Sequence, residues 1–216
     1  MIYRDITPEQ LAELIRQAVQ AELARRVRRV PVGVSVRHVH LCRQDVERLY
    51  GPGYQLTPKK KLSQPGQFAC EEQVTVVGPK GKIEKVRILG PERKESQVEM
   101  AFSDCRVLGL DAPVRPSGRI DGTPGCTLIA ANGRQLELSR GVIIADRHLH
   151  LSTAQADAFG LKDGDIISIQ VDGVKPGVME HVTVRAGDSY EMDFHIDTDD
   201  ANAFQLKQGQ WVSIKE

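Results

Sequence analysis

Four of the six histidines in this 216-residue chain fall in two copies of the pattern Arg-His-x-His-Leu, at residues 37–41 and 147–151. On an extended strand, residues i and i+2 project to the same side. His38 and His40 therefore present two imidazoles on one face, and so do His148 and His150. Two such rings can converge on one metal ion, each through one ring nitrogen. A single His-x-His is more often an ordinary pair of surface or core histidines, but the duplication favours metal binding.

Two further residues are candidate third ligands. His195 lies in an alternating run at residues 191–197, where a strand would place it on one face with three acidic residues. It could complete the second histidine pair, although a solvent-facing polar strand edge would give the same pattern. Glu99 ends the charged segment 90–99 and could add a carboxylate oxygen to a two-histidine site. His181 is interpreted as structural or exposed.

Arg93 is the candidate anion-binding residue of the same charged segment. Its planar guanidinium matches the oxygens of a phosphate group in a way that lysine does not. An ordinary solvated turn would also explain this segment. Residues 59–61 are three lysines, a run that is usually a solvated loop but could also meet the phosphates of a ligand. The sequence contains no glycine-rich phosphate loop, so a nucleotide would have to be held in another way.

The composition excludes several classes of protein. Basic and acidic residues are equal at 29 each, which argues against a general nucleic-acid binder. No run of 18 apolar residues predicts a membrane-spanning helix, and the N-terminus lacks the pattern of a signal peptide. The four cysteines have no Cys-x-x-Cys spacing, so reduced thiols in the cytosol are expected. These features predict a cytoplasmic protein without a nucleic-acid or membrane partner.

The N-terminal segment predicts an amphipathic helix. Thr7 is the expected N-cap, Pro8 takes the first helical position and Gln10 completes a capping box. Apolar residues then recur every three or four positions along one face: Leu11, Leu14, Ile15, Ala18, Val19 and Leu23. A lone helix of this length is only marginally stable in water, so this apolar stripe needs a partner. It could pack on its own domain or dock on another protein, and the sequence leaves both open.

The rest of the chain is predicted to be mainly β. From Val30 on, short β-branched runs alternate with glycine- and proline-containing turns, a pattern typical of barrels or sandwiches. The predicted strands are 32–36, 74–77, 85–89, 141–145, 166–171, 181–185, 191–196 and 211–214. The predicted short helices lie near residues 42–49, 152–159 and 199–204.

An internal repeat indicates two related halves. Residues 33–41 resemble residues 141–151, and each segment is followed by a short helical pattern and a glycine. Taken alone, the repeat would divide the chain near residues 118–132. If the halves are related by pseudosymmetry, their His-x-His corners could meet at one interface.

Three motifs together resemble the PduL-type phosphate propanoyltransferases of bacterial microcompartments: Val-Ser-Val-Arg-His-Val-His-Leu, Gly-Pro-Glu-Arg-Lys-Glu-Ser-Gln-Val-Glu and Asp-Arg-His-Leu-His-Leu. The resemblance covers essentially the whole chain, and the N-terminal helix is similar to the encapsulation peptides of some members. It implies reversible transfer of a short acyl group, propanoyl or acetyl, between coenzyme A and phosphate in propanediol degradation. It further implies a homo-oligomer inside a cytoplasmic microcompartment, bound to shell or cargo proteins through this helix.

The resemblance also implies the residues of the site. Two zinc ions per chain would be held, the first by His38, His40 and Glu99, the second by His148, His150 and His195. Arg93 would be the catalytic residue that binds phosphate. The residues near coenzyme A would be Ser35, Lys60, Arg87, Leu89, His195 and Asn202.

The implied fold is all-β, with two small β-barrels capped by short helices and preceded by the N-terminal amphipathic helix. The helix would occupy residues 1–27. The first barrel would combine residues 28–36 with 146–216, and the second would span 37–145, with an inserted hairpin near 51–71. We follow this division rather than the tandem one from the repeat, because a crossing strand explains how both His-x-His corners share one cleft.

Two other functions are compatible with these motifs. A metal-dependent hydrolase also uses His-x-His on a strand, but such sites usually sit on larger α/β barrels, and this chain has few helical patterns. A non-catalytic microcompartment cargo protein would use the N-terminal helix, but it would leave Arg93 and the duplicated histidines without a task. The hydrolase would act without phosphate, and the cargo protein would keep its partner after loss of His40.

Overall fold

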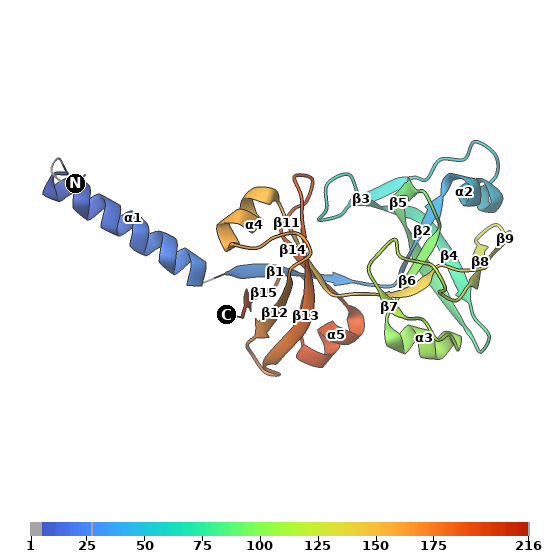
Figure 1. Ribbon diagram of the computed structural model, residues 1–216. Helices are drawn as coiled ribbons and strands as arrows, with labels where there is room; N and C mark the ends of the chain where they lie inside the picture. The colour runs from blue at the N-terminus through green and yellow to red at the C-terminus, as the bar shows by residue number, and fades with distance from the viewer. Residues whose placement is uncertain (1–5, 27, 216) are drawn as a thin grey trace.

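The computed structural model describes the backbone of residues 6–26 and 28–215. Side chains are described for residues 6–19 and 28–215. The chain folds into two β-sheets with short helices, which confirms the predicted all-β class (Figure 1). One sheet is a closed barrel of six strands in the order β1, β14, β11, β13, β12 and β15. Their bounds are Arg29–Ser35, Asp193–Asp197, His148–Leu151, Gly177–Ala186, Ile166–Val171 and Trp211–Ile214.

The other sheet has nine strands and curls into a half-barrel. Its order is β7, β10, β6, β2, β5, β4, β8 and β9, and β3 pairs with β4. The bounds are Val114–Arg115, Val142–Ala145, Gln97–Met100, His38–Cys42, Lys82–Arg93, Phe68–Val77, Cys126–Ala130, Gln135–Leu138 and Pro58–Lys61. All eight segments predicted as strands coincide with strands of these two sheets.

The chain passes between the two sheets twice, each time just before a His-x-His strand. It leaves the barrel after β1 and enters the nine-stranded sheet at β2, and it returns between β10 and β11. The tandem division near residues 118–132 is therefore wrong, because β8 lies inside the nine-stranded sheet, paired with β4 and β9. A repeat in sequence marks the start of each half but does not reveal that β1 pairs with β14 of the later half.

Each sheet encloses its own apolar core. The barrel core contains Phe194, Leu149 and Ile169, all fully buried. The core of the nine-stranded sheet contains Leu41 and Ile88, also fully buried. Along β4, residues alternate between buried and partly exposed, as expected for a strand with one face on a core. Two separate cores allow the space between the sheets to be lined by polar side chains.

Four short helices follow the strands that carry the candidate ligands. Their bounds are α2 Arg43–Tyr50, α3 Phe102–Leu108, α4 Thr153–Phe159 and α5 Thr198–Phe204. Three coincide with predicted helices, and α3 was not predicted. Helix α3 is hard to predict because a helix is recognised by an apolar face that becomes buried. In α3 the apolar residues Phe102 and Val107 are exposed, whereas the polar Asp104 is buried. None of the four cysteines, all within the described residues, forms a disulfide.

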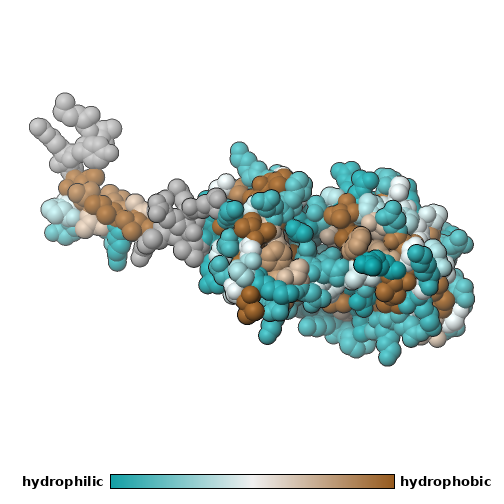
Figure 2. All heavy atoms as spheres, turned by 90° about the horizontal axis from the view of Figure 1, so that it is seen from below, coloured by the Kyte–Doolittle hydropathy of each residue, from teal (hydrophilic) through white to brown (hydrophobic). Residues whose placement is uncertain are grey.

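The predicted N-terminal helix is present as α1 (Pro8–Arg26), and it projects away from both sheets (Figure 1). Thr7 and Gln10 form the predicted capping box, with reciprocal bonds of 3.0 and 3.2 Å. The described part of the apolar stripe forms a hydrophobic band on the helix (Figure 2), and its residues Leu11, Leu14, Ile15 and Val19 are each more than half exposed. The side chain of Leu23 lies outside the described residues. In the described part of the chain, no helix is long and apolar enough to cross a membrane.

Candidate metal and anion site

Each His-x-His strand runs between one antiparallel and one parallel neighbour, and the antiparallel neighbour supplies a third ligand. In the nine-stranded sheet, His38 of β2 lies directly opposite Glu99 of β6. In the barrel, His148 of β11 lies directly opposite His195 of β14. The ligand atoms of each group of three lie within 4.8 Å of one another. We call these groups the first triad (His38, His40, Glu99) and the second triad (His148, His150, His195).

The first triad is buried and contains one carboxylate. The Glu99 carboxylate lies 3.4 Å from Nε2 of His38 and 3.7 Å from Nε2 of His40. Burial alone would raise the pKa of Glu99, but the two imidazoles hold this pKa well below its usual value. Burial opposes the charged form of His38, yet Glu99 leaves the pKa of His38 raised. Burial and the neighbouring His38 lower the pKa of His40 to about 3.

The second triad consists of three imidazoles, with ring centroids 4.6 to 5.2 Å apart. Burial, with the neighbouring His195, lowers the pKa of His148 to about 4. Burial, with both neighbouring rings, lowers the pKa of His150 to about 2. Nε2 of His195 lies 2.9 Å from a carboxylate oxygen of the buried Asp193. A carboxylate behind a histidine is the usual arrangement around a metal ligand, because it fixes the ring and its tautomer.

Both triads suit a metal ion such as zinc. A metal binds the neutral imidazole, and the depressed pKa values keep His40, His148 and His150 neutral near pH 7. Among the described residues, Nδ1 of His40 and both ring nitrogens of His150 are buried without a hydrogen-bond partner. Buried polar atoms without partners are rare and costly, and coordination through either ring nitrogen of His150 would satisfy one of them. Sets of three nitrogen and carboxylate ligands are typical of zinc sites that keep one position open.

The two triads are held in place by equivalent hydrogen bonds and ion pairs. Nδ1 of His38 lies 2.8 Å from the carbonyl oxygen of Val36, and Nδ1 of His148 lies 2.7 Å from that of Asp146. These bonds leave Nε2 of each ring to face a metal. The arginine of each Arg-His-x-His-Leu motif pairs with an aspartate of the helix after the third ligand, at 2.8 Å in both halves. These pairs are Arg37 with Asp104 and Arg147 with Asp200.

A glycine on β1 makes room for the second triad. Gly33 lies beside His195 in the parallel pairing of β1 with β14. A Cβ atom at this position would come 2.3 Å from Oδ1 of Asp193 and 2.5 Å from Cδ2 of His195. No side-chain Cβ tolerates such distances, so the close packing of Asp193 and His195 against this strand requires glycine.

Arg93 lies beside the first triad, held there by a hydroxyl group. Its guanidinium donates to Oγ of Ser117 at 2.8 Å, and this hydroxyl donates to Oε1 of Glu99 at 2.7 Å. The amide of Gln97 reaches both Ser117 (2.9 Å) and Glu99 (2.6 Å). Burial lowers the pKa of Arg93, and the like charge of Arg185 acts in the same direction. The guanidinium nevertheless stays protonated, because its ordinary pKa lies so far above 7.

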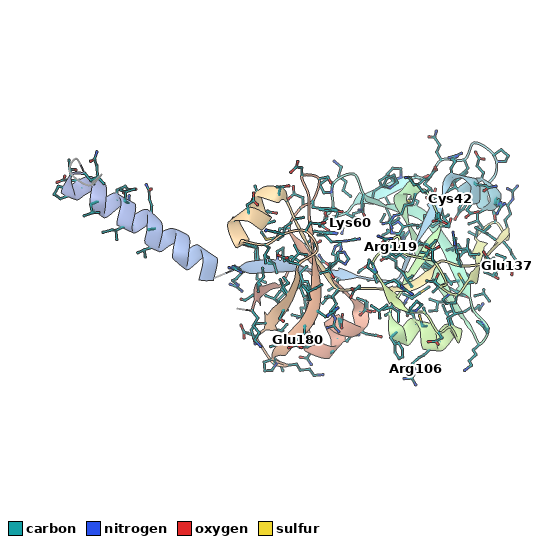
Figure 3. The ribbon with its side chains drawn as sticks, in the orientation of Figure 1. Cys42, Lys60, Arg106, Arg119, Glu137 and Glu180 are labelled. Carbon is teal, nitrogen blue, oxygen red and sulfur yellow. The ribbon has the colours of Figure 1, made fainter. Side chains whose placement is uncertain are left out.

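Both triads and Arg93 line a single cavity of about 790 Å³, which opens between the two sheets. Four other predicted residues, Ser35, Lys60, Arg87 and Leu89, line the same cavity. Lys60 of β3 is labelled in the space between the barrel and the nine-stranded sheet (Figure 3). Asn202 is not among the lining residues; it is an exposed residue of α5. The cavity thus brings together residues from positions 33 to 208 of the chain.

Sequence reasoning missed several other residues of this cavity, among them four polar ones: Gln64, Ser117, Arg185 and Tyr190. Arg185 faces it because β13 pairs with β11, which places Arg185 opposite His150. Each of the four is a polar residue in a turn or on a strand face, where such residues are ordinary. Of the four, only Arg185 could have been suspected from the sequence. The alternation along the predicted strand 181–185 places Arg185 on one face with His181 and Thr183.

Comparison with known proteins identifies the family of this chain. The family model described as phosphate propanoyltransferase matches residues 31–207. A phosphate propanoyltransferase of Thermotoga maritima is 48% identical over 81% of this chain and 83% of its own length. One of Enterococcus faecalis is 45% identical over 87% and 88%, and one of Salmonella typhimurium is 46% identical over 85% and 87%. The chain therefore belongs to the phosphate propanoyltransferase family and is a phosphate acyltransferase.

Proposed function

We propose that the chain transfers a short acyl group, propanoyl or acetyl, reversibly between coenzyme A and inorganic phosphate. The single observation that carries this proposal is the common cavity, in which two metal-ligand triads and one arginine meet. An acyl transfer to phosphate needs a cation that holds the phosphate and a site that stabilises charge on the thioester. In this proposal Arg93 is that cation, and the two triads form the site that stabilises the charge.

In this proposal, Arg93 holds the phosphate against the thioester carbonyl. Ser117 and Glu99 fix the guanidinium on one side, which leaves its remaining N–H groups free to bind two phosphate oxygens. Inorganic phosphate is a weak nucleophile, so alignment of its oxygen with the carbonyl carbon lowers the barrier mainly through orientation. A phosphate oxygen forms a bond to the acyl carbon, the bond between this carbon and sulfur breaks, and coenzyme A leaves as the thiolate, which takes up a proton to give the thiol.

The two triads would each hold one zinc ion, the first through His38, His40 and Glu99 and the second through His148, His150 and His195. When bound, zinc supplies Lewis acidity that polarises a carbonyl or stabilises a thiolate, worth several kcal/mol. The triads differ in charge, because only the first contains a carboxylate. We therefore expect the first triad to hold its ion more tightly than the second.

Coenzyme A would lie along the part of the cavity lined by Ser35, Lys60, Arg87 and Leu89, next to His195. Lys60 and Lys61 both line this part, and their charges would attract the phosphates of the cofactor. Asn202 would contact coenzyme A only if the cofactor extended beyond the cavity onto α5.

The test of this function is the release of thiol from propanoyl-CoA and acetyl-CoA, with and without phosphate. We expect release that depends on phosphate and produces one acyl phosphate for each thiol. Release at the same rate without phosphate would instead identify a metal-dependent hydrolase. If neither substrate released thiol, the chain would act without catalysis, as a cargo protein.

We further propose that α1 delivers the enzyme into a bacterial microcompartment by docking on a shell or cargo protein. Its apolar stripe is exposed rather than packed on either sheet in its described part, which supports docking on a partner. The proposed address, residues 1–27, includes residues 1–5 and 27, which lie outside the described residues.

Removal of residues 1–27 is expected to leave turnover within about twofold of the full chain, since both triads and the cavity lie outside this segment. The same deletion should abolish co-sedimentation with purified microcompartments. A shortened chain that precipitates or loses activity would show that the helix packs on the body instead. Replacement of Leu14 and Ile15 by serine serves as a milder variant, because it interrupts the apolar stripe but keeps the helix length.

A further inference from the structure

His150 differs from the other histidines of its triad in how its ring is held. His148 is fixed by the carbonyl oxygen of Asp146, and His195 is fixed by the carboxylate of Asp193. His150 is 5% exposed, and neither of its ring nitrogens has a hydrogen-bond partner among the described residues. A metal ligand without such a bond needs another contact to keep its ring in place.

Tyr190 provides that contact. Its ring lies parallel to the ring of His150, with centroids 4.5 Å apart and planes only 2° apart. A parallel stack restricts rotation of the imidazole about its side-chain bonds while leaving the ring nitrogens free. Tyr190 lies in the loop between β13 and β14, and its backbone N–H donates to the carbonyl oxygen of Gly187 at 3.0 Å.

The loop that carries Tyr190 is tied to the other sheet by one side chain. Gln64 belongs to the turn between β3 and β4, and it is only 3% exposed. Its Nε2 donates to the carbonyl oxygen of Glu191 at 2.9 Å, and its Oε1 accepts from the N–H of Glu191 at 3.3 Å. The amide nitrogen and the amide oxygen of Gln64 thus both bind the backbone of Glu191, the residue after Tyr190.

These contacts form a continuous path from the nine-stranded sheet to a metal ligand in the barrel. Gln64 holds the backbone of Glu191, the adjacent Tyr190 stacks on His150, and His150 belongs to the second triad. Gln64, Tyr190 and His150 all line the same cavity. No equivalent exists for the first triad among the described aromatic contacts, where the ring of His40 faces only that of His38.

We propose that Tyr190 is a positioning residue for His150, and that Gln64 keeps Tyr190 in place from the opposite sheet. We call these two residues the clasp. The inference rests on the proposed function, because it assumes that the second triad binds a metal. It adds that the affinity of this triad depends on a residue of the other sheet, so the second metal site is complete only when the two sheets are held together.

The experiment measures zinc affinity rather than turnover. The full chain is stripped of metal and titrated with zinc in competition with a chromogenic chelator, which resolves the two sites. Tyr190→Ala is expected to weaken the second site about 10- to 100-fold, the usual cost of losing a group that orients a ligand, and to leave the first unchanged. Tyr190→Phe keeps the stack and should bind as the wild type does.

Gln64→Ala tests the other half of the clasp without touching the stacked rings. It should weaken the same site by a smaller factor, and Gln64→Glu should do likewise, because a carboxylate cannot donate to the carbonyl oxygen of Glu191. Tyr54→Ala is the matched control. Tyr54 also stacks on a neighbouring ring, that of Tyr50, with centroids 4.8 Å apart, but it does not line the cavity.

Three results would overturn the clasp. The first is wild-type affinity at both sites in Tyr190→Ala, and the second is an equal loss in Tyr190→Phe and Tyr190→Ala. The third is wild-type zinc affinity of the second site in Gln64→Ala. This variant also tests the clasp if Tyr190→Ala does not fold. A wild-type chain that takes up no zinc would be a different failure, because it would contradict the proposed metal sites themselves and the clasp with them.

Discussion

Replacement of Arg93 by alanine is expected to lower turnover about a hundredfold or more, the usual effect of removing one donor that stabilises a developing anion. Arg93 lines the cavity beside the first triad, where it contacts both the hydroxyl of Ser117 and the carboxylate of Glu99. Without it, phosphate would lose its alignment with the thioester. The measurement is thiol release from propanoyl-CoA over a range of phosphate concentrations.

The unfolding temperature of Arg93→Ala should change little. One third of the Arg93 side chain is exposed, and Ser117 keeps its bonds to Gln97 and Glu99 when the guanidinium is gone. Lys94→Ala is the matched control, since it removes the neighbouring cation, which is exposed and does not line the cavity. Arg93→Lys should recover only part of the rate, because an ammonium group cannot form two parallel bonds to phosphate. Near-wild-type turnover of Arg93→Ala at saturating phosphate would exclude this role.

Removal of metal is expected to lower thiol release by at least about a hundredfold, and zinc should restore it. The expected size follows from the several kcal/mol that a Lewis acid contributes, with each 1.36 kcal/mol worth about tenfold. The intact chain should contain two zinc ions. His40→Ala and His148→Ala should each contain one, since the two triads share no ligand. Elemental analysis after gel filtration gives the ratio of zinc to protein.

His181 is the natural control for these substitutions. It is the one histidine of the six outside both triads, and it is exposed. His181→Ala should therefore keep two zinc ions and full activity. If chelation reduced the metal content to zero without affecting thiol release, the ions would have a structural role only. In that case the charge on the thioester would have to be stabilised by Arg93 and its neighbours alone.

The ligand histidines could be found from the sequence because they carry a local pattern. Arg-His-x-His-Leu occurs twice, and the alternation of a strand is enough to bring His38 beside His40 and His148 beside His150. The helix caps and turns are local as well, so the start of α1 was predicted to the residue. Glu99 and His195 were harder to find, since their role depends on which residue of another strand lies opposite.

Only the sheet register explains why those two residues are equivalent. Glu99 and His195 differ in chemistry and in sequence context, yet each lies directly opposite the first histidine of its motif. The supporting ion pairs of Asp104 and Asp200 follow from the same arrangement, because each helix begins just after the strand that carries the third ligand. Pairing between strands far apart in sequence produces no periodic pattern of residues, so the sequence does not predict which residues lie opposite each other.

The amino-acid sequence by itself determined the class of fold, the N-terminal helix and the two His-x-His motifs, because these depend on neighbours within a few positions. The tertiary structure decided how the halves share one cavity, since β1 crosses into the barrel that residues 148–214 complete. It also decided the contacts of Gln64 with Glu191, which are 127 positions apart. Contacts at such separations depend on how two complete sheets face each other, and no short segment encodes that arrangement.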